Sequence, residues 1–200
     1  MNYLAHVYLS FGIPEITVGN LISDFVKGKK KFDYPARIQQ GITLHRAIDD
    51  FTDRHVVTQR AKLVFKEAYG LYAGPITDVV HDHFLANDTL IFAGSSQLEA
   101  FAQKTYAQVG DWQTVLPERF GRMFHYMRTQ NWLYNYRLKE GLYNSLAGLA
   151  RRAAYMGDAD RACRLFDANY AELQQCYADF FPSLKDFALR TLENLQRDKG

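Results

Sequence analysis

The spacing of apolar residues is the feature of this 200-residue chain that most limits its possible folds. Apolar side chains recur every three or four positions, as in Leu63, Phe65, Ala68, Tyr69 and Tyr72. This period places them on one face of an α-helix. No segment of any length alternates apolar with polar residues, as a half-buried β-strand would. The pattern therefore predicts an all-α fold.

Helix-breaking residues divide the chain into about nine helical segments. The expected segments are residues 2–11, 15–26, 35–53, 57–72, 75–90, 95–109, 114–135, 140–155 and 158–196. We expect the last segment to be interrupted at Phe181-Pro182-Ser183, because proline lacks the N–H that a helix interior needs. The length suits a single domain over residues 1–200.

Composition and charge exclude several classes of protein. The chain is 48% hydrophobic and 23% charged, as is ordinary for a soluble protein, and its 14% of aromatic residues predicts an aromatic-rich core. A net charge of +2 is too small to indicate nucleic-acid binding through global electrostatics.

Targeting and disulfide signals are weak. The N-terminal stretch lacks a basic region and a run of roughly 20 apolar residues, so we expect neither a secretory signal nor membrane insertion. Cys163 and Cys176 form no C-x-x-C pair and lie beside no histidine. Disulfides and Cys-ligated zinc are therefore not expected, and a cytoplasmic location fits best.

Basic residues gather in one local run. Its members are Lys27, Lys29, Lys30, Lys31 and Arg37. Two interpretations stay open from the residues alone: a solvated loop, or a docking patch for an acidic partner.

The stretch DVVHDHFL, residues 78–85, places two carboxylates and two imidazoles within six positions of a predicted helix. Asp78, His81 and Asp82 share a face by their spacing. Neighbouring carboxylates repel, so such a pair persists where a cation, a shared proton or a basic side chain offsets the repulsion. His83 lies about 140° round the helix from Asp78.

Three further predicted helices carry an acid or an imidazole among apolar residues: His6, Asp24, and the pair His45 and Asp49. Each alone has a structural explanation. His6 could be a hydrogen-bonded core histidine, Asp24 could pair with a nearby lysine, and His45 and Asp49 could bond to each other. Their joint occurrence with the 78–85 stretch favours one shared metal site.

Histidine and aspartate without cysteine suit divalent ions that accept nitrogen and oxygen ligands, such as Mn²⁺, Mg²⁺, Fe²⁺ or Zn²⁺. A carboxylate-rich set favours Mn²⁺ or Mg²⁺. Metal sites of this kind hydrolyse phosphate esters, since the ion activates water and neutralises phosphoryl oxygens. The chain has no glycine-rich phosphate loop, no serine-hydrolase elbow and no Glu-x-x-His pair of di-iron proteins.

Five motifs, in order, resemble those of the acyl carrier protein phosphodiesterase family, also called acyl carrier protein hydrolases, which are divergent relatives of HD-domain phosphohydrolases. They are MNYLAHVYLS, GNLISDFVKG, GITLHRAIDDFTD, PITDVVHDHFL, and NWLYNYR with GLARR. The resemblance runs from Met1 to Pro182. It implies an HD-like helical bundle that removes 4′-phosphopantetheine from holo acyl carrier protein. It also implies a divalent ion, Mn²⁺ foremost, with Mg²⁺, Fe²⁺ or Co²⁺ as alternatives.

The resemblance also implies roles for individual residues. The expected metal ligands are Asp24, His45, Asp78 and Asp82. The expected catalytic groups are His83, Asp49 and Arg46. His83 or Asp49 would orient water or protonate the leaving oxygen, while Arg46 would bind a phosphate oxygen or else pair with Asp49 or Asp50. His6, His81 and Asn20 are expected as neighbours of the site. The doublet reads Asp-His where HD proteins have His-Asp, which leaves the exact ligand set open.

Acyl carrier proteins are small and acidic, so the resemblance gives the basic run Lys27, Lys29, Lys30, Lys31 and Arg37 a role in docking. Two alternative functions remain open: an HD-type hydrolase of a nucleotide or another small phosphoester, and a non-catalytic helical binding module with a structural polar cluster. The choice of substrate distinguishes the first alternative from a carrier-protein hydrolase. The effect of removing metal with a chelator distinguishes the second alternative from an enzyme. No nucleic-acid or membrane partner is expected, and the oligomeric state is left open.

Overall fold

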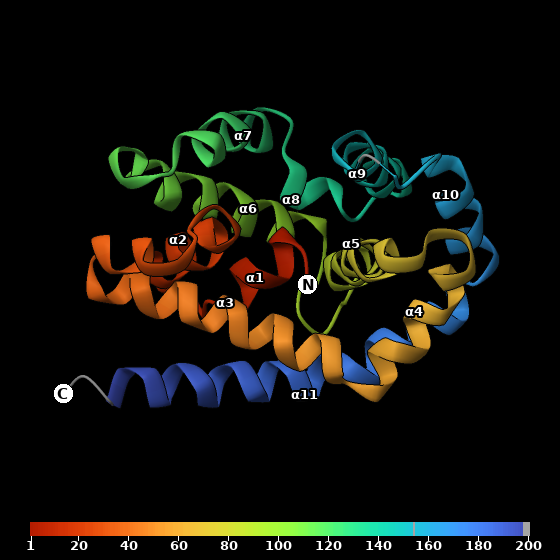
Figure 1. The fold of residues 1–200 in the computed structure, drawn as a ribbon, viewed down its shortest axis with the longest axis horizontal. Helices are drawn as coiled ribbons and strands as arrows, with labels where there is room; N and C mark the ends of the chain where they lie inside the picture. Colours follow the sequence, from red (N-terminus) through yellow and green to blue (C-terminus); the bar gives the residue numbers. More distant parts are fainter. Residues whose placement is uncertain (154, 198–200) are drawn as a thin grey trace.

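The structure is a computed structural model that describes residues 1–153 and 155–197. Within these residues it contains eleven α-helices and four short 3₁₀ helices (Figure 1). No β-strand occurs within those ranges, so the all-α prediction is confirmed. Fully buried Phe65, Tyr106, Phe120, Tyr136 and Phe166 confirm the aromatic-rich core. The likeness to HD-domain proteins stays a prediction.

The α-helices are α1 (Tyr3–Tyr8), α2 (Pro14–Ile22), α3 (Ala36–Arg54), α4 (Val56–Tyr69), α5 (Ala73–Ala86), α6 (Ser95–Gly110), α7 (Glu118–Thr129), α8 (Trp132–Asn135), α9 (Lys139–Arg152), α10 (Ala159–Ala168) and α11 (Tyr170–Arg197). The 3₁₀ helices are η1 (Ser23–Phe25), η2 (Gly28–Asp33), η3 (Gly70–Tyr72) and η4 (Gln113–Val115). Within the described part of the chain, none of these helices has the length and apolarity to cross a lipid bilayer. Cys163 and Cys176 are free thiols, as expected.

The predicted break at Phe181-Pro182-Ser183 is wrong. Helix α11 runs through Pro182 without interruption. Phe180, Phe181 and Leu184 are buried around it, and their packing outweighs the one hydrogen bond that proline cannot donate. The predicted segment 158–196 divides earlier, at Asn169, between α10 and α11.

The predicted segment 114–135 also divides. Asn131 has a φ of 49°, in the left-handed region, and this residue separates α7 from α8. Asparagine tolerates that conformation better than most residues. The remaining predicted segments match helices of the structure, with shifts of a few residues at their ends.

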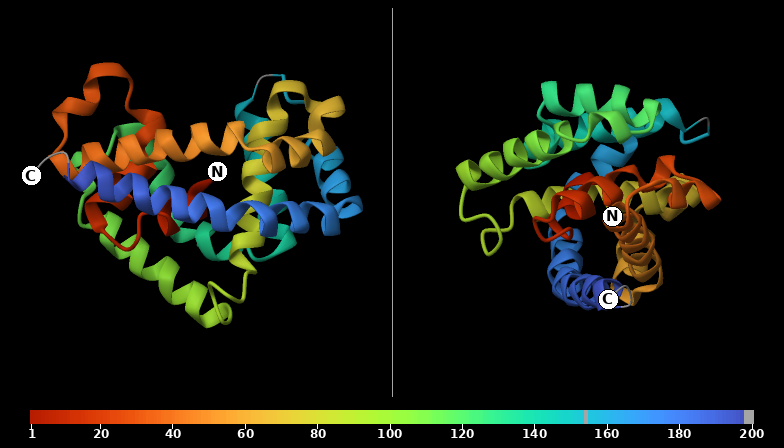
Figure 2. Two further views of the ribbon diagram at one scale, coloured as in Figure 1. Left: turned by 90° about the horizontal axis from the view of Figure 1, so that it is seen from below. Right: turned by 90° about the vertical axis from the view of Figure 1, so that its left-hand side faces the viewer.

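Helices α3 and α11 lie side by side and run in opposite directions along the long axis of the molecule (Figures 1 and 2). Helix α1 lies between α2 and α5 near the centre and contacts both. Four of its six residues, Leu4 to Val7, are buried. A short helix thus carries His6 into the interior.

Helices α2 and α3 pack in close backbone contact because each has a glycine where they meet. A Cβ atom on Gly19 would lie 2.1 Å from the carbonyl oxygen of Ile38, and a Cβ atom on Gly41 would lie 2.4 Å from that of Ile16. Only glycine permits this approach. Asn20 follows Gly19 and His45 lies one turn after Gly41, so the contact brings these two side chains together.

Candidate metal centre

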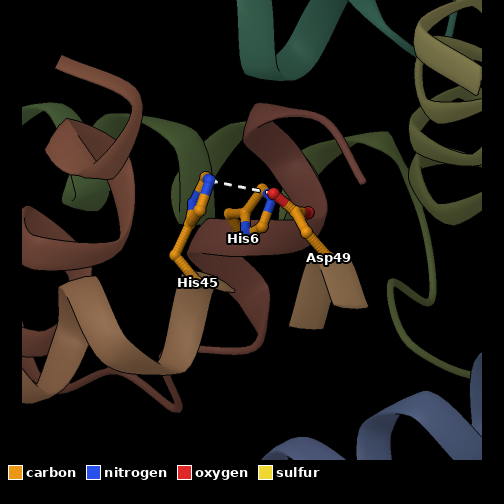
Figure 3. A group of neighbouring side chains, drawn as sticks. All are labelled: His6, His45 and Asp49. Carbon is orange, nitrogen blue, oxygen red and sulfur yellow. Dashed lines mark ion pairs between the residues drawn. The ribbon is translucent and has the colours of Figure 1, made fainter. Parts of the chain in front are cut away.

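Helices α1 and α3 bring His6, His45 and Asp49 together (Figure 3). Nε2 of His6 lies 3.2 Å from Oδ1 of Asp49, and Nε2 of His45 lies 3.1 Å from Oδ2 of the same carboxylate. The two imidazole rings stack with centroids 3.9 Å apart. One ligand atom from each residue lies within 4.8 Å of the others. We call these three residues the His-His-Asp cluster.

Asn20 keeps a proton on Nδ1 of His45. Its amide nitrogen donates to the carbonyl oxygen of His6 at 2.9 Å and to the hydroxyl of Ser10 at 3.1 Å. Its Oδ1 therefore faces Nδ1 of His45, at 3.2 Å, and accepts the hydrogen there. With Nδ1 held as a donor to Asn20, Nε2 is the nitrogen that can release its proton and bind a metal.

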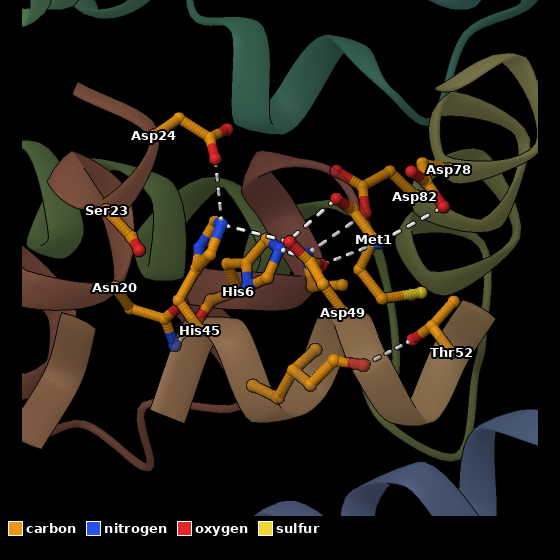
Figure 4. A network of polar contacts seen from close by, with 12 residues as sticks. Met1, His6, Asn20, Ser23, Asp24, His45, Asp49, Thr52, Asp78 and Asp82 are labelled. Carbon is orange, nitrogen blue, oxygen red and sulfur yellow. Dashed lines mark hydrogen bonds and ion pairs between the residues drawn. The ribbon is translucent and has the colours of Figure 1, made fainter. Parts of the chain in front are cut away.

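Asp24 occupies the exposed side of the cluster. It lies on η1, directly after α2, and its Oδ1 is 3.3 Å from Nε2 of His45 (Figure 4). The Asp24 side chain is 73% exposed, whereas that of His45 is 8% exposed. Solvent therefore reaches the cluster beside Asp24 and also at Asp49, whose side chain is 39% exposed.

The carboxylates and imidazoles shift one another's pKa values. Burial alone would lower the pKa of His45, but its hydrogen bonds to Asp24 and Asp49 outweigh burial and raise the pKa to about 9. Burial lowers the pKa of His6 to about 4. Burial would raise the pKa of Asp49, yet hydrogen bonds from both histidines hold it well below its usual range. The hydrogen bond from His45 also lowers the pKa of Asp24.

Asp78 joins the network through the amino group of Met1. That nitrogen lies 3.1 Å from Oδ1 of Asp78 and 3.3 Å from Oδ1 of Asp49. Burial would lower the pKa of the amino group, but the two carboxylates raise it to about 10. The structure thus brings Asp78 to the edge of the cluster rather than into contact with its histidines.

Asp82 holds the first turn of α1. Its Oδ2 accepts a hydrogen bond from the backbone N–H of Leu4 at 2.7 Å, and its Oδ1 accepts one from Ala5 at 3.1 Å. The side chain is fully buried, and burial raises its pKa to about 7 against these two bonds. Sequence reasoning expected Asp82 as a metal ligand. The structure uses both of its oxygens to position the helix that carries His6.

His83, expected as a catalytic group, is not brought to the cluster. Its Nδ1 lies 2.7 Å from the carbonyl oxygen of Tyr136, and its Nε2 lies 3.4 Å from the hydroxyl of Tyr170. Its ring packs edge-on against Phe166. These contacts direct His83 toward α10 and the start of α11.

His81 faces α11. It is fully buried, its ring stacks on Phe180 at 5.3 Å, and neither ring nitrogen has a hydrogen-bond partner among the described residues. Burial lowers its pKa to about 3. The expected shared face of Asp78, His81 and Asp82 spans about 100° of the helix. Within that arc, Asp78 faces the amino group of Met1, Asp82 faces the first turn of α1, and His81 faces α11.

Arg46 pairs with neither Asp49 nor Asp50. Its Nη2 donates to the carbonyl oxygen of Val26 at 2.9 Å, and the side chain lies on the exposed side of α3. Asp50 pairs instead with Arg54 at 2.7 Å. Arg46 therefore ties α3 to the segment between η1 and η2.

The basic run is not an irregular loop, because residues 28–33 form η2. Lys27, Lys29, Lys30 and Arg37 are exposed, and Lys31 is half-buried. The run begins directly after the segment that carries Asp24. It is therefore available to a partner that approaches the cluster.

Fold and site together define a class: helical proteins in which imidazoles and carboxylates from separate helices can hold a divalent ion. The comparison with known families goes further. The chain belongs to the acyl carrier protein phosphodiesterase family, whose model matches residues 1–184. The family resemblance of the motifs is thus confirmed.

Individual relatives cover almost the whole chain. A Photorhabdus laumondii protein named acyl carrier protein phosphodiesterase is 29% identical over 188 residues, 94% of this chain and 95% of its own length. A protein of the same name from Salmonella agona is 32% identical over 193 residues, 95% of this chain and 98% of its own. No solved structure matches the chain.

Proposed function

We propose that this chain hydrolyses the phosphodiester that joins 4′-phosphopantetheine to a serine of holo acyl carrier protein, and that it needs a divalent metal ion to do so. The observation that carries the proposal is the convergence of His6, His45 and Asp49 in a chain of the acyl carrier protein phosphodiesterase family. A cytoplasmic location accompanies it, since free cysteines suit a reducing compartment.

The donor set fits an ion such as Mn²⁺. It offers imidazole nitrogens and carboxylate oxygens without a thiolate. Two ligands of one such ion lie at most about 4.2 to 4.4 Å apart, because each bond is about 2.1 to 2.2 Å long. The donor atoms already lie within 4.8 Å of one another, so small side-chain rotations suffice.

The residues divide the work as follows. His6, His45 and Asp49 would hold the ion, and Asp24 would complete the set from the exposed side. A bound ion would lower the pKa of a water molecule and neutralise the charge on the phosphoryl oxygens. Asn20 keeps the proton of His45 on Nδ1, and Asp49 stays ionised at neutral pH because its pKa is held low. The proposed role of Asp49 thus moves from proton transfer to metal binding.

The experiment uses metal-stripped protein and holo acyl carrier protein, with and without Mn²⁺, and follows the intact mass of the carrier. We expect the loss of one phosphopantetheine only when the ion is present. Asp49→Asn should abolish the loss. Asp50→Asn is the matched control, because Asp50 is the next residue of α3, is exposed and pairs with Arg54.

A folded wild-type protein that releases no prosthetic group with any divalent ion would overturn the proposal. Activity that survives chelation would contradict the proposed dependence on a divalent ion. In the first case, a panel of nucleotides and small phosphoesters would test the alternative hydrolase function.

A further inference from the structure

A pocket of about 300 Å³ opens beside Asp24, between η1 and the first turn of α7. Its lining residues are Asp24, Phe25, Lys27, Pro117, Glu118 and Arg119. The ring of Phe25 packs edge-on against Phe120 of α7, with centroids 5.4 Å apart, so the two walls are held together. Asp24 belongs both to this pocket and to the metal centre.

The charges in the pocket are unevenly matched. Glu118 forms an ion pair with Arg122 on α7, and Asp24 pairs with His45. Lys27 and Arg119 form no ion pair with an acidic residue in the described part of the chain. The pocket therefore offers two exposed cations beside the metal centre, and its chemistry suits an anion.

The proposed reaction also needs a group that holds the phosphoryl oxygens. Arg46 was the residue expected for this role, but its guanidinium is bound to the carbonyl oxygen of Val26. The pocket offers other cations for this role and adjoins the metal centre, because Asp24, one of its walls, is bonded to His45.

We propose that Arg119, together with Lys27, binds the non-bridging oxygens of the substrate's phosphoryl group in this pocket. A planar guanidinium suits two oxygens of one phosphate, and an ammonium adds a point charge. This inference rests on the proposed function and names its phosphoryl subsite. The same chemistry would bind free inorganic phosphate, so the two sources need separate measurements.

The test compares Arg119→Gln with Arg164→Gln. Arg164 is also exposed, but it lies on α10, at the opposite end of the molecule from η2 (Figure 1). Three quantities are measured on Mn²⁺-loaded protein: KM for holo acyl carrier protein, KM for bis(4-nitrophenyl) phosphate, and the inhibition constant of inorganic phosphate. Mn²⁺ affinity and thermal unfolding are measured alongside.

Arg119→Gln should raise all three constants by about tenfold or more, because a charge-assisted hydrogen bond to phosphate is lost. Mn²⁺ affinity and thermal unfolding should not change, and Arg164→Gln should behave as wild type. Unchanged constants in Arg119→Gln would overturn the subsite. A rise confined to the carrier protein would also overturn it, because Arg119 would then contact the protein rather than the phosphate.

Failure of the proposed function looks different. If the wild-type protein releases no prosthetic group, calorimetric titration of the Mn²⁺-loaded protein with inorganic phosphate still tests the subsite. Weaker phosphate binding by Arg119→Gln would support the subsite even though the reaction is another one. Equal binding by both proteins would refute the subsite as well.

Discussion

Among single residues, Asn20 has the clearest indirect role, because its amide oxygen holds the proton on Nδ1 of His45 and so leaves Nε2 for the metal. Asn20→Ala removes the acceptor at Nδ1, so we expect Mn²⁺ affinity to fall about 10- to 100-fold. Calorimetric titration of the metal-stripped protein measures this. Asn144→Ala is the control, since Asn144 is exposed on α9, away from the cluster. Unchanged affinity in a folded Asn20→Ala protein would contradict the role.

His81 predicts a pH dependence of stability. Its pKa in the folded protein is about 3 and its ordinary value is 6.5, so the unfolded chain binds a proton between these values that the folded chain does not. His81 therefore costs stability as pH falls below 6.5. At pH 5 this cost is about 2 kcal/mol.

His81→Phe should remove that part of the pH dependence, because phenylalanine can stack on Phe180 without a titratable nitrogen. Urea unfolding at pH 7.5 and pH 5 measures the free energy of unfolding of the variant and of the wild type. The contributions of His6 and Asp82 cancel in the difference, because both proteins contain these residues. His125→Gln, which replaces a histidine at an exposed position, is the control. If the free energy of unfolding of His81→Phe changes between pH 7.5 and pH 5 as much as that of the wild type, the buried ring does not titrate as described.

Single residues also show the limit of sequence reasoning at this site. Asp24, His45 and Asp49 stand out in the sequence and the structure brings them together. His6 was expected only as a neighbour, although its place in a wholly apolar run was a signal of burial. His83 could not be placed, because a helical pattern gives the angle of a side chain but not the element that it faces.

Helix α1 depends on a side chain from another helix. Asp82→Ala would leave the buried N–H groups of Leu4 and Ala5 without an acceptor, so we expect a loss of about 2 to 4 kcal/mol in the free energy of unfolding. The measurement is urea unfolding in the presence of a chelator. Asp50→Ala, at an exposed position, is the control. A variant with wild-type stability in chelator but weaker Mn²⁺ binding would restore the predicted ligand role of Asp82.

The contact between α2 and α3 should tolerate no side chain at Gly19. Gly19→Ala places a Cβ 2.1 Å from a backbone oxygen, which forces the helices apart. We expect a loss of about 3 kcal/mol in stability together with weaker Mn²⁺ binding, because Asn20 and His45 separate. Thermal unfolding and metal titration measure the two effects.

Gly121→Ala is the matched control for Gly19→Ala. Gly121 lies within α7, and a Cβ there would meet nothing within 4 Å. Alanine should stabilise that helix by up to about 1 kcal/mol. Equal effects of the two substitutions would show that helix propensity, and not close packing, governs Gly19.

The helices themselves were largely predictable, because apolar period and breaker residues are local signals. Their interruptions were not. Pro182 reads as a break, but buried Phe180 and Phe181 keep α11 continuous. Asn169 carries no strong breaker signal, yet the chain turns there. In both cases packing between distant segments decides the outcome.

For the whole molecule, the basic run predicts how an acidic carrier protein would dock. Reversing Lys29 and Lys30 to glutamate should raise KM for holo acyl carrier protein with little loss of kcat, and the effect should shrink at high salt. KM for bis(4-nitrophenyl) phosphate should not change. Reversing Lys66 and Arg164, which are exposed elsewhere, is the control. An unchanged KM for the carrier would contradict docking through this run.

The hydrogen bonds from α1 to Asp82 also affect the order in which the helices fold. The two hydrogen bonds join residues 78 and 77 positions apart, and closing so long a loop is entropically costly. Helix α1 has only six residues, too few to persist alone. We therefore expect α1, and with it His6, to reach its final place only once α5 has docked. The metal centre is then a late product of folding, and a bound ion would slow unfolding more than it would speed folding.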